Sequence, residues 1–157
     1  MTVTVHIELQ YEFQVHAQAD EVFSVLSNVP LSVSHFPKVH RLVDLGEGVY
    51  QWEMEKVGTK QVHLQTVYAC KYVSDKAKRT VKWTPVKGIG NAEVRGSWKI
   101  KDQKTSTQVT LNIEADVSVA LPALMRVVVE PVVRKEFEDL VDQYVANLIE
   151  RFGGEVE

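Results

Sequence analysis

The amino-acid sequence predicts one α+β domain, residues 1–157, in which a seven-stranded, curved antiparallel sheet wraps around a long C-terminal helix. Seven segments alternate apolar and polar residues, which is the pattern of strands with one buried face. The segment after Pro122 instead carries apolar residues at helical spacing. With 45% hydrophobic and 25% charged residues, a chain of this length fits a single core.

The first strand is expected over residues 3–15. Apolar side chains fall on every second position from Val3 to Val15, and polar residues such as His6 and Glu8 fill the positions between them. This alternation is clearest in antiparallel sheets with one solvated face. The first segment therefore predicts a long, half-buried strand.

Two short helices are expected next. Asp20 and Glu21 open a run with apolar residues at helical spacing, and acidic residues there complement the helix dipole. The triplet Asn28-Val29-Pro30 ends this run. A second short helix is then expected from Val33 to Phe36, before Pro37.

Six further alternating segments predict the rest of the sheet. Turn signals such as Gly46-Glu47-Gly48 separate them. The expected strands lie near residues 41–45, 50–54, 62–72, 81–83, 92–101 and 109–119.

The C-terminal helix is expected from Pro122, which suits the first position of a helix, to about Arg151, before the stop Gly153-Gly154. It is the only element large enough to cover the sheet. Because a curved sheet and a helix differ in curvature, a space remains between them. Side chains fill that space, or it stays open as a pocket.

The order of elements resembles the START-like, or SRPBCC, superfamily with its helix-grip fold. The residues that carry the resemblance are Ala19–Asn28, Phe36-Pro37, Val39, Leu42 and Gly96-x-Trp98. The stretches Val49–Trp52 and Val81–Pro85 look most like bacterial polyketide cyclase/dehydrase-like proteins. Asn28 departs from the acidic residue of many relatives. The resemblance covers nearly the whole chain and implies the fold, but its motifs are structural and specify no activity.

Several classes of function are disfavoured by composition. A net charge of −3 argues against a nucleic-acid partner. The single cysteine, Cys70, is expected in the core, and the five histidines have no spacing typical of a metal site. No phosphate-binding or other cofactor motif is recognisable. The sequence shows neither a signal peptide nor a run of ~20 apolar residues, so we expect a cytoplasmic protein without a transmembrane segment.

The candidate ligand-binding residues are rings and polar groups expected to face the helix. Aromatic residues occupy apolar-face positions, where they build a core or line a cavity with their polar atoms. Thr66 is the one polar residue on the apolar face of its strand, and Tyr144 lies on the apolar face of the helix. The candidates on these elements are Tyr50, Trp52, Thr66, Tyr68, Trp83, Trp98 and Tyr144.

Arg126 and Glu130 complete the candidate set. A rotation of about 100° per residue, run back from Phe137, places both on the face that meets the sheet. A charged pair there is costly unless it borders water or a ligand. Pro131 bends the helix, and the bend would turn the pair outward into solvent. Both interpretations remain open at this point.

Three functions fit this pattern. The first is binding of a lipophilic small molecule, such as a lipid, quinone, isoprenoid or polyketide-like compound, in the cavity. The second is a polyketide cyclase/aromatase or dehydratase-type enzyme, with Arg126 and Glu130 acting beside Tyr68 or His35. The third is a protein-interaction module with a filled core. An apolar cavity without inward charge favours binding of a small molecule. An inward Arg126–Glu130 pair favours the enzyme. A space that side chains fill completely favours the protein-interaction module.

Overall fold

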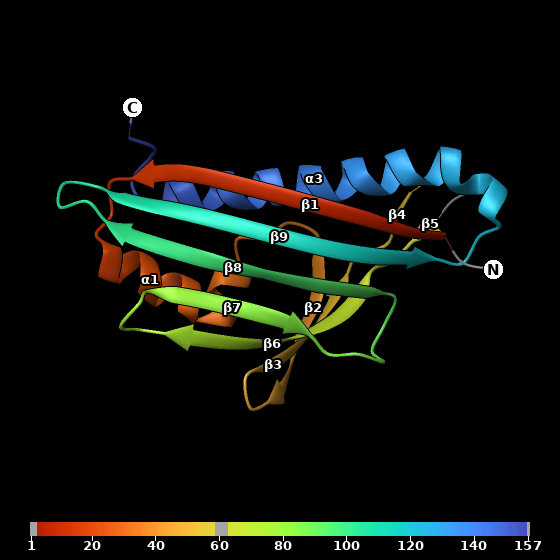
Figure 1. Ribbon diagram of the computed structural model, residues 1–157, viewed down its shortest axis with the longest axis horizontal. Helices are drawn as coiled ribbons and strands as arrows, with labels where there is room; N and C mark the ends of the chain where they lie inside the picture. Colours follow the sequence, from red (N-terminus) through yellow and green to blue (C-terminus); the bar gives the residue numbers. More distant parts are fainter. Residues whose placement is uncertain (1–2, 59–62, 157) are drawn as a thin grey trace.

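The computed structural model describes residues 3–58 and 63–156 (Figure 1). Its elements, in order, are β1 (Val3–Val15), α1 (Ala19–Ser27), α2 (Val29–Val33), β2 (Val39–Gly46), β3 (Val49–Met54), β4 (Val57–Gly58), β5 (His63–Leu64), β6 (Val67–Asp75), β7 (Thr80–Pro85), β8 (Ala92–Asp102), β9 (Thr107–Val119), a 3-10 turn η1 (Ala123–Met125) and α3 (Arg126–Arg151).

Seven strands form one antiparallel sheet in the order β1-β9-β8-β7-β6-β3-β2, which confirms the predicted fold class. The chain's first and last strands are neighbours, because β1 pairs with β9 over all thirteen of its residues. Helix α3 runs along β1 and contacts it, while α1 lies against β7 and β8 (Figure 1). None of the helices within the described residues is long and apolar enough to cross a membrane.

The alternating residues form the core as expected. Val3, Val5 and Ile7 on β1 are buried, as are Val109 and Leu111 on β9. Their polar neighbours on both strands face outward. Cys70 is also buried, which confirms its predicted place in the core.

Gly96 has a packing reason. A Cβ atom at this position would lie 2.6 Å from Cζ2 of Trp83 and 2.3 Å from the carbonyl oxygen of Asn112. Both are closer than a real Cβ contact, so only glycine lets the Trp83 ring lie against β8. The Gly96-x-Trp98 motif therefore reflects how the neighbouring strand packs.

The second helix begins earlier than the sequence predicted. It spans Val29–Val33 instead of starting at Val33. The Asn28 side chain accepts a hydrogen bond from the Leu31 backbone N–H at 3.3 Å, and Pro30 sits in the first turn. Both residues favour a helix start, so the triplet that ends the first helix also begins the second.

The strand predicted over residues 62–72 is interrupted. Strand β6 begins only at Val67, while His63–Leu64 pair with β4 in a separate two-stranded ladder; Val62 lies outside the described residues. The Asn91 side chain donates to the Gln65 carbonyl oxygen at 3.0 Å and accepts from the Val67 N–H at 2.9 Å. These side-chain bonds replace strand pairing where the strand breaks.

Candidate functional site

Two small cavities lie between the sheet and the helices. The inner cavity is lined by the helices α1, α2 and α3 and by the strands β3, β6, β7, β8 and β9. The volume within which the centre of a water-sized sphere fits is about 40 Å³. The outer cavity lies nearer the surface and offers about 30 Å³ by the same measure. Phe36, Tyr68 and Phe137 line both cavities and so form the partition between them.

The polar groups of the inner cavity are hydroxyls and indoles. The hydroxyls of Ser32 and Tyr144 are hydrogen-bonded at 2.5 Å, and Nε1 of Trp52 donates to the Tyr72 hydroxyl at 3.0 Å. Among the residues described, no side chain that lines this cavity carries a formal charge at neutral pH. The cavity is therefore an apolar space with a few fixed polar atoms.

Burial keeps the tyrosines of this cavity protonated. It raises the pKa of Tyr144 to about 12, although the hydrogen bond with Ser32 acts in the opposite direction. Burial also raises the pKa of Tyr68 and of Tyr72 well above 10.0. A phenolate is unfavourable in a space that water does not solvate. At neutral pH these hydroxyls are donors and acceptors without charge.

The outer cavity has a charged rim. Nζ of Lys38 lies 3.2 Å from Oε1 of Glu136, and both residues line the cavity. Lys38 comes from the connection between α2 and β2 and has a positive φ of 58°, whereas Glu136 belongs to α3. The ion pair thus joins these two elements beside the outer cavity.

Six of the predicted site residues line the cavities. Trp52, Tyr68, Trp83, Trp98 and Tyr144 line the inner cavity, and Thr66 lines the outer one together with Tyr68. Their part in ligand binding remains a prediction. Tyr50 is half-buried, packs edge-on against Tyr72 with ring centroids 5.9 Å apart, and lines a shallow surface hollow instead.

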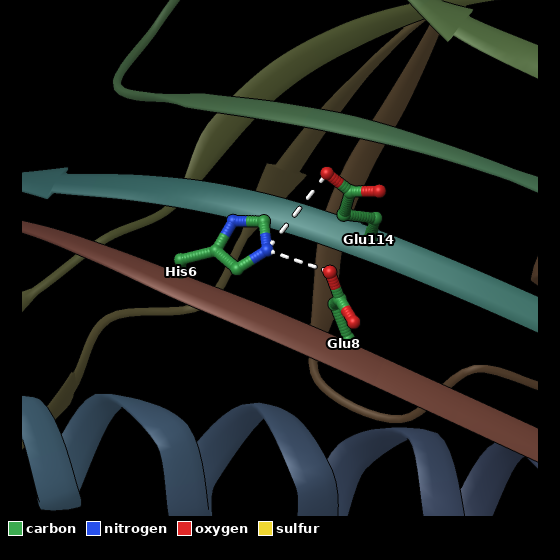
Figure 2. A group of neighbouring side chains, drawn as sticks. All are labelled: His6, Glu8 and Glu114. Carbon is green, nitrogen blue, oxygen red and sulfur yellow. Dashed lines mark hydrogen bonds and ion pairs between the residues drawn. The ribbon is translucent and has the colours of Figure 1, made fainter.

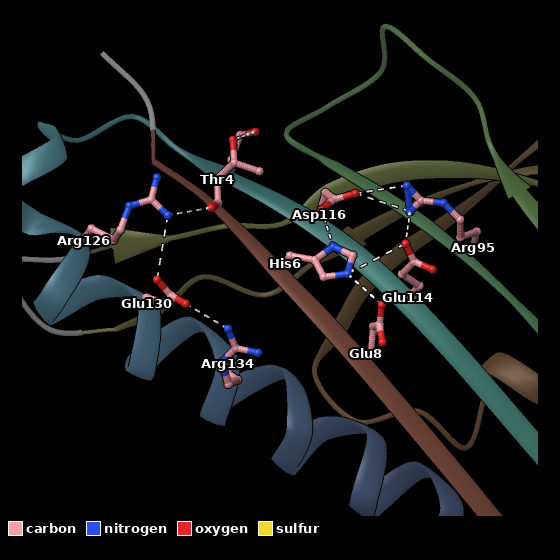
Figure 3. Close-up of polar contacts among 10 residues, drawn as sticks. Thr4, His6, Glu8, Arg95, Glu114, Asp116, Arg126, Glu130 and Arg134 are labelled. Carbon is pink, nitrogen blue, oxygen red and sulfur yellow. Dashed lines mark hydrogen bonds and ion pairs between the residues drawn. The ribbon is translucent and has the colours of Figure 1, made fainter.

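Arg126 and Glu130 lie away from both cavities. Their side chains are 52% and 35% exposed, and the Arg126 guanidinium donates to the Thr4 carbonyl oxygen at 3.3 Å. Glu130 lies between Arg126, at 3.8 Å, and Arg134, at 2.9 Å (Figure 3). The pair therefore has the outward placement, one of the two alternatives that the sequence left open.

The inward alternative came from one rotation applied to the whole helix. Leu148 and Glu130 are 18 residues apart, which is five full turns at about 100° per residue, so the count puts both on one face. In the first half of α3, however, the buried residues are Val129 and Val133. The buried face therefore shifts along the helix, and a single rotation does not follow it.

Ser32 and the partition residues Phe36 and Phe137 were not among the sequence-predicted site residues. Ser32 is buried because it lies beside Val29 and Val33 on the inner side of α2. Asn28 caps the start of α2, and this capping signal in the sequence could have shown that Ser32 lies within the helix. His35, a predicted alternative for acid–base chemistry, bonds the Leu31 carbonyl oxygen through Nδ1 at 3.0 Å and lines neither cavity.

A second polar cluster lies on the outer face of the sheet. Nε2 of His6 is 3.0 Å from Glu8 and 3.8 Å from Glu114, and Nδ1 is 2.7 Å from Asp116 (Figures 2 and 3). The ligand atoms of His6, Glu8 and Glu114 lie close enough together to hold a cation. Hydrogen bonds that the His6 ring donates to Glu8 and then to Asp116 raise the pKa of His6, and Arg95 lies 3.0 Å from Asp116. Ion pairing within the cluster accounts for the arrangement, and it lies on the opposite face from the cavities.

Solved structures share this architecture. A START superfamily protein from Mycobacterium smegmatis superposes with a TM-score of 0.68 at 14% identity, covering 93% of this chain and 97% of its own. The Zhui aromatase/cyclase from Streptomyces sp. R1128 gives 0.60 at 18% identity, covering 94% and 90%. Norcoclaurine synthase from Thalictrum flavum gives 0.57 at 20% identity, covering 95% and 98%. At these identities the likeness concerns the fold alone.

The sequence itself identifies the family. No curated protein sequence matches the chain. Residues 6–152, however, match the family described as polyketide cyclase/dehydrase and lipid transport, so the match runs from within β1 to the end of α3. The chain therefore belongs to the polyketide cyclase/dehydrase and lipid-transport family.

Proposed function

We propose that the protein binds an uncharged lipophilic small molecule, of the lipid, quinone, isoprenoid or polyketide-like class, between the sheet and α3. One observation carries this proposal: the inner cavity is lined by apolar and aromatic side chains with only neutral polar groups. Such a lining favours an apolar ligand that accepts or donates one or two hydrogen bonds. The Ser32–Tyr144 pair and the Tyr68 hydroxyl are the groups that would orient it.

The ligand has to widen the space. A buried water needs roughly 10–15 Å³ of such volume, so the two cavities as they stand hold only a few waters. Phe36 and Phe137, which separate them, are each half-buried. We infer that a ligand displaces these two rings and joins the cavities, while the fully buried core stays in place.

The cyclase or dehydratase alternative is less well supported. That chemistry needs an acid and a base near the reacting atoms. Arg126 and Glu130, the residues considered for it, lie on the surface, and the described hydroxyls of the inner cavity have a raised pKa. A raised pKa makes each of them a poor acid near neutral pH. Binding without chemistry therefore fits the site better.

Native mass spectrometry of the purified protein, before and after organic extraction, tests the proposal. We expect a co-purifying apolar compound that is lost on extraction. The identified compound, or else a panel of lipids and quinones, is then titrated against the extracted protein. The fluorescence of Trp52, Trp83 and Trp98 reports binding, because all three line the inner cavity.

Two matched variants locate the site. Val33→Phe adds a ring beside the inner cavity, whereas Val73→Phe makes the same change at an exposed position of β6. We expect Val33→Phe to weaken binding by about tenfold or more, because it occupies space the ligand needs, and Val73→Phe to have no effect. Equal affinities would place the ligand elsewhere. Failure to find or bind any compound would instead favour a filled-core interaction module.

A further inference from the structure

Phe36 borders three separate spaces. It lines the inner cavity, the outer cavity and the surface hollow between α2 and β2, which Tyr50 also lines. No other described residue lines all three of these spaces. A movement of this one ring therefore changes how the three spaces connect.

The surface hollow has room for an aromatic ring, which the cavities lack. It offers about 390 Å³ by the measure that gives about 40 and 30 Å³ for the inner and outer cavities. Val39, Leu42 and Tyr50 line it and would cover a ring that moved there. Phe137, the other half-buried ring of the partition, does not line this hollow. Of the two rings, Phe36 is thus the one with a space to move into.

The backbone on both sides of Phe36 is tied to α3. The His35 carbonyl oxygen accepts a hydrogen bond from the Asn147 amide at 2.8 Å. On the other side, Lys38 forms its ion pair with Glu136 at 3.2 Å. These ties hold the connection between α2 and β2 in place, so the part of Phe36 that can move is its side chain.

The ring itself is held by contacts that the hollow can replace. Its centroid lies 5.3 Å from that of Trp52 and 4.9 Å from that of Tyr144. A rotation about χ1 takes the ring from one staggered position to another. In the hollow it would exchange these aromatic neighbours for Tyr50 and Leu42, so it stays covered by apolar and aromatic groups.

We propose that Phe36 is the gate of the binding site. Its ring swings into the hollow, which joins the outer cavity to the inner one and admits the ligand. The ligand then occupies the space that the ring has left beside Trp52 and Tyr144, while Phe137 shifts within the joined space. The role in ligand uptake rests on the proposed function, whereas the swing itself requires no ligand and is measured without one.

Acrylamide quenching of tryptophan fluorescence tests the swing in the ligand-free protein. All three tryptophans of the chain line the inner cavity, so acrylamide reaches them only when this cavity opens. Leu42→Phe adds a ring inside the hollow, whereas Leu45→Phe makes the same change at an exposed position of β2 that does not line it. We expect the quenching constant to fall about twofold or more in Leu42→Phe and to stay at the wild-type value in Leu45→Phe.

A double variant shows whether the hollow acts through the gate. Phe36→Ala leaves no ring to swing, so it should be quenched more than wild type. Adding Leu42→Phe to Phe36→Ala should then have no further effect. Val39→Phe fills the same hollow and replaces Leu42→Phe if that variant does not fold, as judged by circular dichroism.

Stopped-flow association of N-phenyl-1-naphthylamine, an uncharged apolar fluorophore, tests ligand uptake in the same variants. We expect Leu42→Phe to slow association about tenfold and Leu45→Phe to leave it unchanged. Equal quenching in these two variants would overturn the gate, as would a full effect of Leu42→Phe in the Phe36→Ala background. The expected quenching without binding of the fluorophore, or of any lipid or quinone of the panel, would instead contradict the proposed function and leave the gate in place.

Discussion

The two halves of α3 differ in what they show to solvent. In the second half, Val141 and Leu148 face the core while Asp139, Asp142 and Gln143 face outward. In the first half, apolar side chains lie on both sides, with Val129 and Val133 inside and Val127, Val128 and Val132 outside. The second half thus has the pattern of a helix with one buried and one solvated face. The outward valines of the first half add nothing to the core.

Their attachments to the rest of the protein differ as well. The second half is held by the Ser32–Tyr144 hydrogen bond, by the Asn147 amide, which donates to the His35 carbonyl oxygen at 2.8 Å, and by the Tyr11–Asp142 hydrogen bond. The first half is held by the Arg126 guanidinium, which donates to the Thr4 carbonyl oxygen, and by the Lys38–Glu136 ion pair. We therefore expect the second half to contribute more to global stability.

The largest expected effect is on the core of the second half. Leu148→Ala removes a side chain that is 0% exposed, and the cavity left behind should cost about 2–5 kcal/mol of unfolding free energy. Leu124→Ala, at an exposed position just before α3, should change it by less than about 0.5 kcal/mol. Urea unfolding measures both. Similar losses for the two variants would mean that Leu124 is part of the core, and the comparison would fail.

Alkaline pH acts on the same half through Tyr144. Burial raises its pKa from 10.0 to about 12, so below pH 10 the tyrosine is neutral in both states and its stabilising contribution is complete. Above pH 10 the unfolded chain loses this proton first. Stability should therefore fall as pH rises from 10 to 12, with Tyr144 accounting for about 2–3 kcal/mol at most.

Urea unfolding in this pH range measures the loss, and Tyr144→Phe is the matched variant. It should show a shallower decline than wild type, because Tyr68 and Tyr72 still titrate with a raised pKa while residue 144 does not. An identical decline in both proteins would show that Tyr144 is not held in a buried, neutral state.

Pro131 offers a test of the first half alone. It lies inside α3, where proline removes a helix hydrogen bond. Pro131→Ala should raise the opening free energy of residues 127–135 by about 1–3 kcal/mol, which slows their amide exchange roughly ten- to a hundredfold. Exchange of residues 141–148 should not change. A parallel slowing of both segments would mean that α3 opens as one unit.

The smallest expected effect concerns Glu130. Glu130→Gln removes the negative charge that pairs with both Arg126 and Arg134. Both ion pairs are partly exposed, so solvent screens them. We expect a loss of less than about 1 kcal/mol in thermal unfolding. A larger loss would identify Glu130 as a structural anchor of the first half, and the exposed pair would then matter to the fold.

The sequence predicted the fold well because its signals are local. Alternation placed β1, β8 and β9 nearly residue for residue, and the glycine pair after α3 marked its end. The break before Val67 could not be predicted in the same way, because it depends on Asn91, which approaches from another part of the chain. A hydrogen bond between a side chain and a distant segment produces no periodic pattern in the sequence.

The candidate site was only partly predictable for the same reason. Strand parity is unambiguous, so Trp52, Tyr68, Trp83 and Trp98 were placed on the correct face. A helix has no such binary choice, and one rotation applied along the whole of α3 put Arg126 and Glu130 among the inward candidates although they lie on the surface. The cavity volumes depend on how rings such as Phe36 and Phe137 pack, which spacing does not encode.

The pairing of β1 with β9 also constrains how the protein is made. Its least separated pair, Val15 with Thr107, is 92 positions apart. Strand β1 therefore leaves the ribosome long before β9, its neighbour in the sheet, exists, with one apolar face uncovered. Contacts of such sequence separation form slowly, and an unpaired strand edge invites aggregation. During synthesis, β1 is thus the segment for which a chaperone would matter most.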